Sequence, residues 1–232
     1  NAPGEIRRLT AITRPSVGVI TMVTAAHLEK LHTVDAVAKA KGELFEEMDG
    51  RGTVVINDED ERIKKLGSAF KGRKISFGMQ NTSDVRFLHM ERIGWDNVRL
   101  KLMVEGKEFE FSLPVPGIHN VMNAMAAIGA ALALGVPAEV SVERIGGFKP
   151  MAMRLERVQL ANGVSMVNDS YNANIGSWEA ALRTVSGFKR VGRFIAVLGD
   201  MLELGHEAVS LHRKAGQLAA EAGVESLYIW GS

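Results

Sequence analysis

The sequence alternates short, continuously apolar runs with helical segments, and this alternation limits the possible folds more than any other feature. Val17 to Val23 is a continuous apolar run without the period-two pattern of a half-exposed strand, and residues 53–56 are predicted to be the next strand. Such runs are typical of parallel strands that are covered on both faces. Between them, a helix is predicted from Thr33, as the N-cap, to Met48. The first part of the chain is therefore predicted to fold as a parallel α/β sheet.

The pattern changes between residues 86 and 113, where apolar and polar residues alternate. Residues 100–104 and 108–113 flank Glu105-Gly106-Lys107, so the sequence predicts an antiparallel hairpin. Pro114-Val115-Pro116-Gly117 ends this section, and an alanine-rich helix is expected over residues 119–134.

A domain boundary is expected at Phe148-Lys149-Pro150, which follows the helix-ending pair Gly146-Gly147. Strands and helices then alternate, at residues 164–167, 177–185, 194–198, 207–222 and 227–230. We therefore expect an α/β protein with two domains. Residues 1–150 are expected to form one domain, with a mostly parallel sheet and a small antiparallel hairpin section. Residues 151–232 are expected to form a second, Rossmann-like, doubly wound domain.

Composition excludes several classes of protein. The 232 residues carry a formal net charge of +1 without a basic stripe, so no nucleic-acid partner is expected. The absence of cysteine excludes disulfides and zinc–thiolate sites, and it fits a reducing compartment. The longest apolar stretch, residues 121–136, contains Asn123 and is short for a membrane span. No membrane span and no secretory signal are predicted.

Two asparagines open the alanine-rich helix. Asn120 and Asn123 are one turn apart and therefore share a face. An Asn amide donates and accepts hydrogen bonds at once, so it can pair with the edge of an adenine. The alternative is that the two residues only begin a core helix.

Other polar blocks follow predicted strands, where α/β proteins bind their ligands. His27 follows the first apolar run, and the blocks 168–174 and 199–205 follow two later strands. Asn, Asp and Ser also favour turns, so these loops could have a purely structural role.

Three blocks in this order, residues 117–127, 168–174 and 199–205, resemble the Mur ligases, the ATP-dependent amide-forming enzymes of peptidoglycan synthesis. The last two blocks are most similar to the members that add D-alanyl-D-alanine to UDP-N-acetylmuramoyl-tripeptide. The resemblance covers nearly all of the chain but about half of a family member. It implies that residues 1–150 are the central, ATPase-like domain without its phosphate-loop part, and that residues 151–232 are an incomplete C-terminal ligase domain. It implies a cytoplasmic, monomeric enzyme that uses ATP and Mg²⁺, with this tripeptide and this dipeptide as substrates.

The resemblance also implies roles for residues in the first part of the chain. Asn120 and Asn123 would bind adenine, and His27, in Ala25-Ala26-His27-Leu28-Glu29, would support a magnesium ion. Lys41 matches a lysine that several family members carry as a carbamate. A bare ammonium cannot ligate Mg²⁺, whereas a carbamate offers the anionic oxygen that this ion prefers.

In the second part, the resemblance implies that Arg154 reaches the γ-phosphate of ATP, for which a guanidinium fork is suited. Asp169 would bind the ribose hydroxyls or their water shell, and Tyr171 and Asn172 would line the nucleotide cleft. Asp200 and Glu203 would hold a substrate ammonium, or would simply begin the next helix.

The chain departs from the family pattern at several points. It has Met22 where the family often has Asn, and Ile175 where Pro is usual. It contains no Gly-x-x-x-x-Gly-Lys-[Ser/Thr] phosphate loop, and it is expected to begin just after a metal-binding Glu of the family. We therefore expect this chain to be inactive by itself.

Other functions stay open at this point. The alternatives are another ligase of the superfamily (MurE-like, MurC-like or folylpolyglutamate synthase-like) and a non-catalytic nucleotide-binding fragment. A Rossmann dehydrogenase is disfavoured, because no Gly-x-Gly-x-x-Gly follows a predicted strand.

Overall fold

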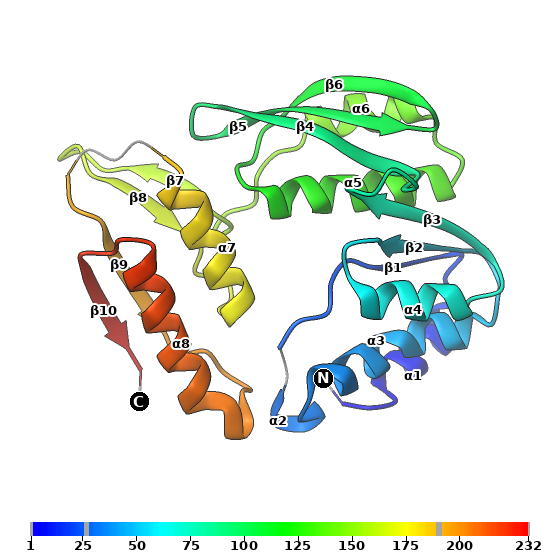
Figure 1. Ribbon diagram of the computed structural model, residues 1–232, viewed down its shortest axis with the longest axis horizontal. Coiled ribbons are helices and arrows are strands. Elements are labelled where there is room, and N and C mark those ends of the chain that lie inside the picture. The colour runs from blue at the N-terminus through cyan, green and yellow to red at the C-terminus, as the bar shows by residue number, and fades with distance from the viewer. Residues whose placement is uncertain (1, 26–27, 189–191, 232) are drawn as a thin grey trace. The chain divides into compact units, whose positions relative to one another are not determined.

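The computed structural model of the chain describes residues 2–25, 28–188 and 192–231 (Figure 1). These residues form two compact units. Unit 1 contains the described residues of Asn1–Thr24 and Thr33–Phe148, and unit 2 contains those of Ala25–His32 and Lys149–Ser232.

Unit 1 is built on a six-stranded sheet with the order β1-β2-β3-β4-β5-β6. The strands are β1 (Val17–Ile20), β2 (Thr53–Asn57), β3 (Arg73–Gly78), β4 (Val85–Ile93), β5 (Asn97–Val104) and β6 (Lys107–Leu113). β1 to β4 are parallel, whereas β5 runs antiparallel to both β4 and β6. The expected parallel sheet with an antiparallel hairpin is confirmed. β3 was not predicted, because Arg73 and Lys74 interrupt its apolar pattern.

Helices cover both faces of the parallel strands, as Figure 1 shows. They are α1 (Glu5–Thr13), α3 (Val34–Met48), α4 (Glu61–Ala69), α5 (Ile118–Ala133) and α6 (Ala138–Gly146). Adjacent residues of β2 face opposite sides, since a β-carbon at Gly129 of α5 would meet Val55 and one at Gly67 of α4 would meet Ile56. This two-sided burial explains why residues 54–56 are continuously apolar.

The predicted helices of unit 1 are present, with shifted ends. Thr33 caps α3 as expected, because its hydroxyl accepts a hydrogen bond from the amide of Ala36 (3.1 Å). Asp60 is the N-cap of α4, and its carboxylate accepts hydrogen bonds from the amides of Arg62 and Ile63.

Unit 2 contains two separate two-stranded sheets. Its elements are α2 (Leu28–Leu31), β7 (Glu156–Gln159), β8 (Ser165–Asn168), α7 (Ile175–Ser186), β9 (Ile195–Gly199), the 3₁₀ turn η1 (Gly205–Glu207), α8 (Ala208–Glu221) and β10 (Ser226–Trp230). β9 and β10 are parallel, as the alternating pattern predicted. The strand expected at residues 164–167 is β8, which instead forms an antiparallel hairpin with β7. The connection between them is too short for a parallel crossover, and Gly163, with φ 84°, closes it.

Helices α7 and α8 pack on a small core. Asn174 and Ser177 form a reciprocal capping box at the start of α7, and the indole of Trp178 donates to the carbonyl of Ala215 in α8 (3.0 Å). Ile175 lies in this core, 7% exposed, so the residue that replaces the usual Pro is buried.

α2 belongs to unit 2, which the sequence did not predict. The amide of Glu29 donates to the carbonyl of Glu203 (3.0 Å), and Gly205 lies directly against Glu29. None of the helices in the described part of the chain combines the length and apolar character that a membrane span requires.

The close contact at Gly129 makes a prediction about stability. A β-carbon there would lie 2.9 Å from Val55 Cγ1, so Gly129→Ala should lower the free energy of unfolding by about 1–2 kcal/mol. Gly216, inside α8, has no atom within 4 Å of such a β-carbon, and Gly216→Ala should raise it by about 0.5–1 kcal/mol. Urea unfolding of both variants checks this. Stabilisation by both substitutions would contradict the packing described.

Candidate functional site

The carboxyl ends of the parallel strands form one edge of the sheet in unit 1. β6 runs in the same direction as β1 to β4, because two antiparallel pairings separate it from β4. α5 follows β6 and therefore begins on the side where β1, β2 and β3 end. Open α/β sheets bind ligands at this edge. The topology places the segments after β1 and β2 and the start of α5, with its two asparagines, on that side.

Three side chains hold the segment that follows β1. The bonds are Asn57 Nδ2 to Thr21 O (2.7 Å), Lys41 Nζ to Met22 O (2.7 Å) and Val23 N to Asp60 Oδ2 (2.9 Å). These bonds replace strand pairing, so the predicted strand 17–23 already ends at Ile20. Asn57 and Asp60 were not identified as site residues from the sequence. The only signal was their position directly after a buried strand.

Lys41 is half-buried in this network. Burial lowers the pKa of its ammonium group below the ordinary value, and the nearby carboxylate of Asp60 partly opposes this effect. A larger fraction of Lys41 is therefore a neutral amine than at a solvated lysine. The contact with Met22 uses the backbone carbonyl, so it does not require the Asn that the family often has there.

The residues fit a magnesium ion only in part. His27, the predicted supporting residue, lies outside the described residues. The described residues contain no group of three or more His, Asp or Glu side chains that could hold a metal ion. Lys41 as an ammonium repels a cation and donates to Met22. In this form the described residues do not provide a Mg²⁺ site.

The two asparagines of α5 differ in their surroundings. Asn120 is half-buried, and its Nδ2 donates to the carbonyl of Pro116 (2.7 Å). Asn123 is exposed. Asn120 thus stabilises the turn before α5, whereas the amide of Asn123 faces solvent at the edge where the sheet would hold a ligand. The structural and the binding interpretations are therefore not exclusive.

His119, beside this pair, was not identified from the sequence. Its Nδ1 is buried and has no hydrogen-bond partner in the described part of the chain. Burial lowers the pKa of its imidazole below the ordinary value. Nothing in the sequence distinguishes this histidine from a solvated one.

This histidine makes a prediction about pH. The unfolded imidazole binds a proton as the pH falls through its ordinary pKa of about 6.5, but the folded one does so only at lower pH. The contribution of His119 to stability is therefore present above pH ~6.5 and is lost on acidification. His119→Gln should reduce the loss of stability between pH 7.5 and pH 5, measured by urea unfolding. His206→Gln, at an exposed histidine, is the control, and equal pH profiles for His119→Gln and the unmodified chain would contradict the prediction.

Unit 2 brings three of the predicted residues together at the end of β8. The guanidinium of Arg154 lies over the ring of Tyr171, 4.0 Å from its centre. Oδ1 of Asp169 accepts a hydrogen bond from the amide of Leu155 (3.0 Å). Asn172, the fourth predicted residue of this loop, is exposed.

The carboxyl of Asp169 is half-buried. Burial raises its pKa, while the Leu155 amide and the positive charge of Arg154 favour the ionised form and partly offset the rise. The cluster therefore offers an acceptor, a cation and an aromatic face, which are the groups that a ribose, a phosphate and a base require.

Asp200 and Glu203 follow β9 and have other contacts. Oδ1 of Asp200 lies 3.9 Å from Nε2 of His212. That nitrogen accepts from the amide of Met201 (3.2 Å), so the ring proton is assigned to Nδ1, beside the carbonyl of Ala208. Glu203 has a left-handed backbone (φ 60°), and its carbonyl binds α2.

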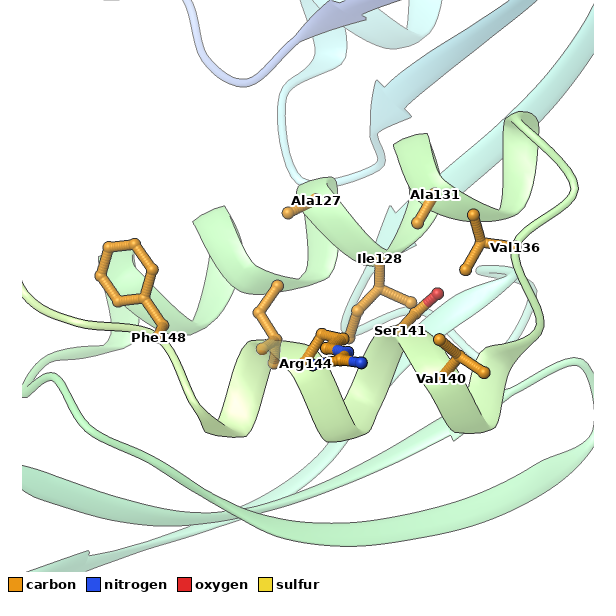
Figure 2. A pocket seen from close by; sticks show the side chains of 9 residues that line it. Ala127, Ile128, Ala131, Val136, Val140, Ser141, Arg144 and Phe148 are labelled. Atoms are coloured by element: carbon orange, nitrogen blue, oxygen red, sulfur yellow. The ribbon is translucent and has the colours of Figure 1, made fainter.

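A pocket of about 280 Å³ lies between α5 and α6 (Figure 2). Its lining is mostly apolar and includes Ala127, Ile128, Val140 and Phe148, with the side chain of Arg144 beside them. None of the predicted site residues lines it. The strand-end loops therefore remain the candidate site.

The fold and these loops define the class of the chain: an α/β protein of two units, each with polar residues at the carboxyl ends of its strands. Two family comparisons agree with this division. Residues 1–131 match the Mur ligase middle domain, and residues 153–232 match the Mur ligase glutamate ligase domain. The chain belongs to the Mur ligase family.

Individual relatives are similar over the whole chain. It is 30% identical over 232 residues to the UDP-N-acetylmuramoyl-tripeptide–D-alanyl-D-alanine ligase of Bacillus subtilis (strain 168), covering 100% of this chain and 49% of that protein. The enzyme of the same name from Escherichia coli (strain K12) is 31% identical, with 97% and 50% covered. A crystal structure of MurF from Acinetobacter baumannii matches 100% of this chain and 50% of its own, with a TM-score of 0.91 and 29% identity. The chain thus spans about half the length of the curated relatives it matches.

Proposed function

We propose that a protein carrying this chain is an ATP-dependent ligase that adds D-alanyl-D-alanine to UDP-N-acetylmuramoyl-tripeptide in the cytoplasm. The observation that carries the proposal is the cluster at the end of β8, where Arg154 meets Asp169 and Tyr171 of the block typical of this branch of the family. The names of the relatives support the choice of substrates. Because the chain covers half of those relatives, the complete activity belongs to the longer protein.

The described residues suit the parts of ATP. Asn123, with Asn120 beside it, would bind the adenine edge through amide hydrogen bonds. Asp169 would accept from ribose hydroxyls, and Tyr171 and Asn172 would line the cleft. Arg154 would bind the γ-phosphate as a charged fork. We assign nucleotide binding to residues 1–150, and to residues 151–232 the part of the ligase that carries Arg154, Asp169, Tyr171 and Asn172.

The proposed reaction has two steps. A carboxylate oxygen of the tripeptide attacks the γ-phosphorus of ATP, and ADP leaves. The amine of the dipeptide then attacks the carbonyl carbon of the resulting acyl phosphate, and inorganic phosphate leaves as the amine loses a proton. Such chemistry depends on positioning and on charge stabilisation more than on a covalent nucleophile. Asp200 and Glu203 would hold the dipeptide ammonium.

Mg²⁺ would supply charge neutralisation on the phosphates. Lys41 would contribute to its site only as a carbamate, together with His27. The lowered pKa of Lys41 supports this modification, since only the neutral amine reacts with CO₂.

The full-length protein tests the proposal. Phosphate release should require ATP, UDP-tripeptide and D-alanyl-D-alanine together. Equal turnover with L-lysine or glutamate as the amine would indicate another ligase of the superfamily instead. The 232-residue chain, whose sequence contains no phosphate loop, should release phosphate many decades more slowly, because positioning supplies on the order of 7–11 kcal/mol of such a barrier.

The asparagine pair tests the nucleotide-binding part of the proposal. In the full-length protein, Asn123→Ala should raise KM for ATP roughly tenfold to a hundredfold. This factor corresponds to the loss of an adenine hydrogen-bond contact, which contributes about 1–3 kcal/mol. Its melting temperature should not fall, because Asn123 is exposed and Ala favours helix. Asn120→Ala should raise KM and also lower the melting temperature, since it removes the bond to Pro116. If Asn123→Ala leaves KM for ATP unchanged, this assignment is wrong.

A further inference from the structure

Arg154 lies between two residues with an unfavourable backbone conformation. Met153 has φ 59° and Leu155 has φ 50°, and neither is glycine. The left-handed region is strained for residues with a β-carbon. Such strain persists only where surrounding contacts impose it, and it concentrates at functional sites. The arginine is thus presented by a backbone that does not adopt this shape by itself.

The contacts that impose this shape come mainly from the loop that follows β8. The carbonyl of Met153 accepts from the amide of Tyr171 (3.3 Å), and the amide of Leu155 donates to Oδ1 of Asp169 (3.0 Å). The amide of Met153 also donates to Oε2 of Glu156 (3.0 Å). Both strained residues are therefore tied to residues 169–171, one through the backbone and one through a half-buried carboxylate.

The same loop contacts the charged end of Arg154. The guanidinium stacks on the ring of Tyr171, which is 60% exposed. A ring so exposed contributes little to the core, so its position is better explained by this contact. An arginine side chain without a partner samples many rotamers, and this freedom must be lost before it can bind a phosphate.

We propose that the loop 169–171 positions Arg154, with Asp169 and Tyr171 as positioning residues for the guanidinium in addition to any contact with nucleotide. The loop fixes the backbone on both sides of residue 154, and the Tyr171 ring fixes the side chain. This inference rests on the proposed function only for the identity of the anion that Arg154 meets. The positioning itself can be tested without catalysis.

The first test measures the geometry in the 232-residue chain. The arginine side-chain Nε–Hε signals are recorded by NMR, and Arg154→Lys identifies the one from residue 154. Tyr171→Leu should remove the ring-current shift of this signal, whereas Tyr171→Phe should retain it. The melting temperature should change little in either variant, because the ring is exposed. An unchanged signal in Tyr171→Leu would overturn the proposal.

The second test separates positioning from stability in the full-length enzyme. Met153→Gly relieves the strained φ, so the melting temperature should be maintained or raised, while kcat should fall as Arg154 gains freedom. Met151→Gly, at an exposed methionine outside this group of strained residues, is the matched control and should leave kcat unchanged. A kcat of Met153→Gly equal to that of the control would overturn the proposal.

The ring itself gives a third measurement. Tyr171→Leu should lower kcat about two- to fivefold relative to Tyr171→Phe, the factor expected for an exposed cation–π contact. Equal kcat in the two variants would count against positioning by the ring. If the NMR shifts behave as expected but the enzyme does not use D-alanyl-D-alanine, the positioning stands and the proposed function fails.

Discussion

The close packing of α5 against the parallel sheet is the contact on which the rest of unit 1 depends. Gly129 lets the helix backbone approach Val55 so closely that a β-carbon would collide with it, and Ile75 lies beside this contact. The buried face of α5 includes Val121, Met125 and Ile128, which join the main core with residues of β2 to β6. Because α5 begins at the carboxyl edge, this packing also fixes where its asparagines lie. The contact that stabilises the unit therefore determines the place of its candidate adenine site.

Both units use a carboxylate to hold a backbone segment near the end of a strand. In unit 1, Asp60 caps α4 with one oxygen and accepts from the amide of Val23 with the other. In unit 2, Asp169 accepts from the amide of Leu155. In each case a segment without strand pairing gains a partner for its polar backbone, which a partly buried site requires. Loops held in this way can present side chains in a fixed geometry.

Sequence patterns predicted whether a segment is a helix or a strand better than they predicted which elements contact one another. A continuous apolar run identified β1, and residues 54–56 of β2 are apolar because both faces of this strand are buried. The antiparallel pairing of β8 with β7 was not predicted, because the apolar pattern of a strand does not indicate which strand pairs with it. Nor was the position of α2 in unit 2, which depends on one backbone bond to Glu203.

The candidate site shows the same limit. Residue type and resemblance predicted roles for Asn120, Arg154, Asp169 and Tyr171. The hydrogen bond from Asn120 to Pro116 and the stacking of Arg154 on Tyr171 could not be predicted from the sequence and are seen only in the structure. The strained backbone beside Arg154 has no sequence signature, and the roles of Asn57 and Asp60 have none beyond their position at the end of a buried strand. They arise from contacts between segments distant in the chain.

The central proposal is that the start of α5 binds the adenine of ATP in a Mur ligase. A crystal structure of the full-length protein with a non-hydrolysable ATP analogue tests it most directly. The account predicts that the adenine edge is hydrogen-bonded to the amide of Asn123 and that the ribose is within reach of Asp169. The γ-phosphate should contact the guanidinium of Arg154. An adenine bound away from the start of α5, for example in the apolar pocket between α5 and α6, would contradict the account.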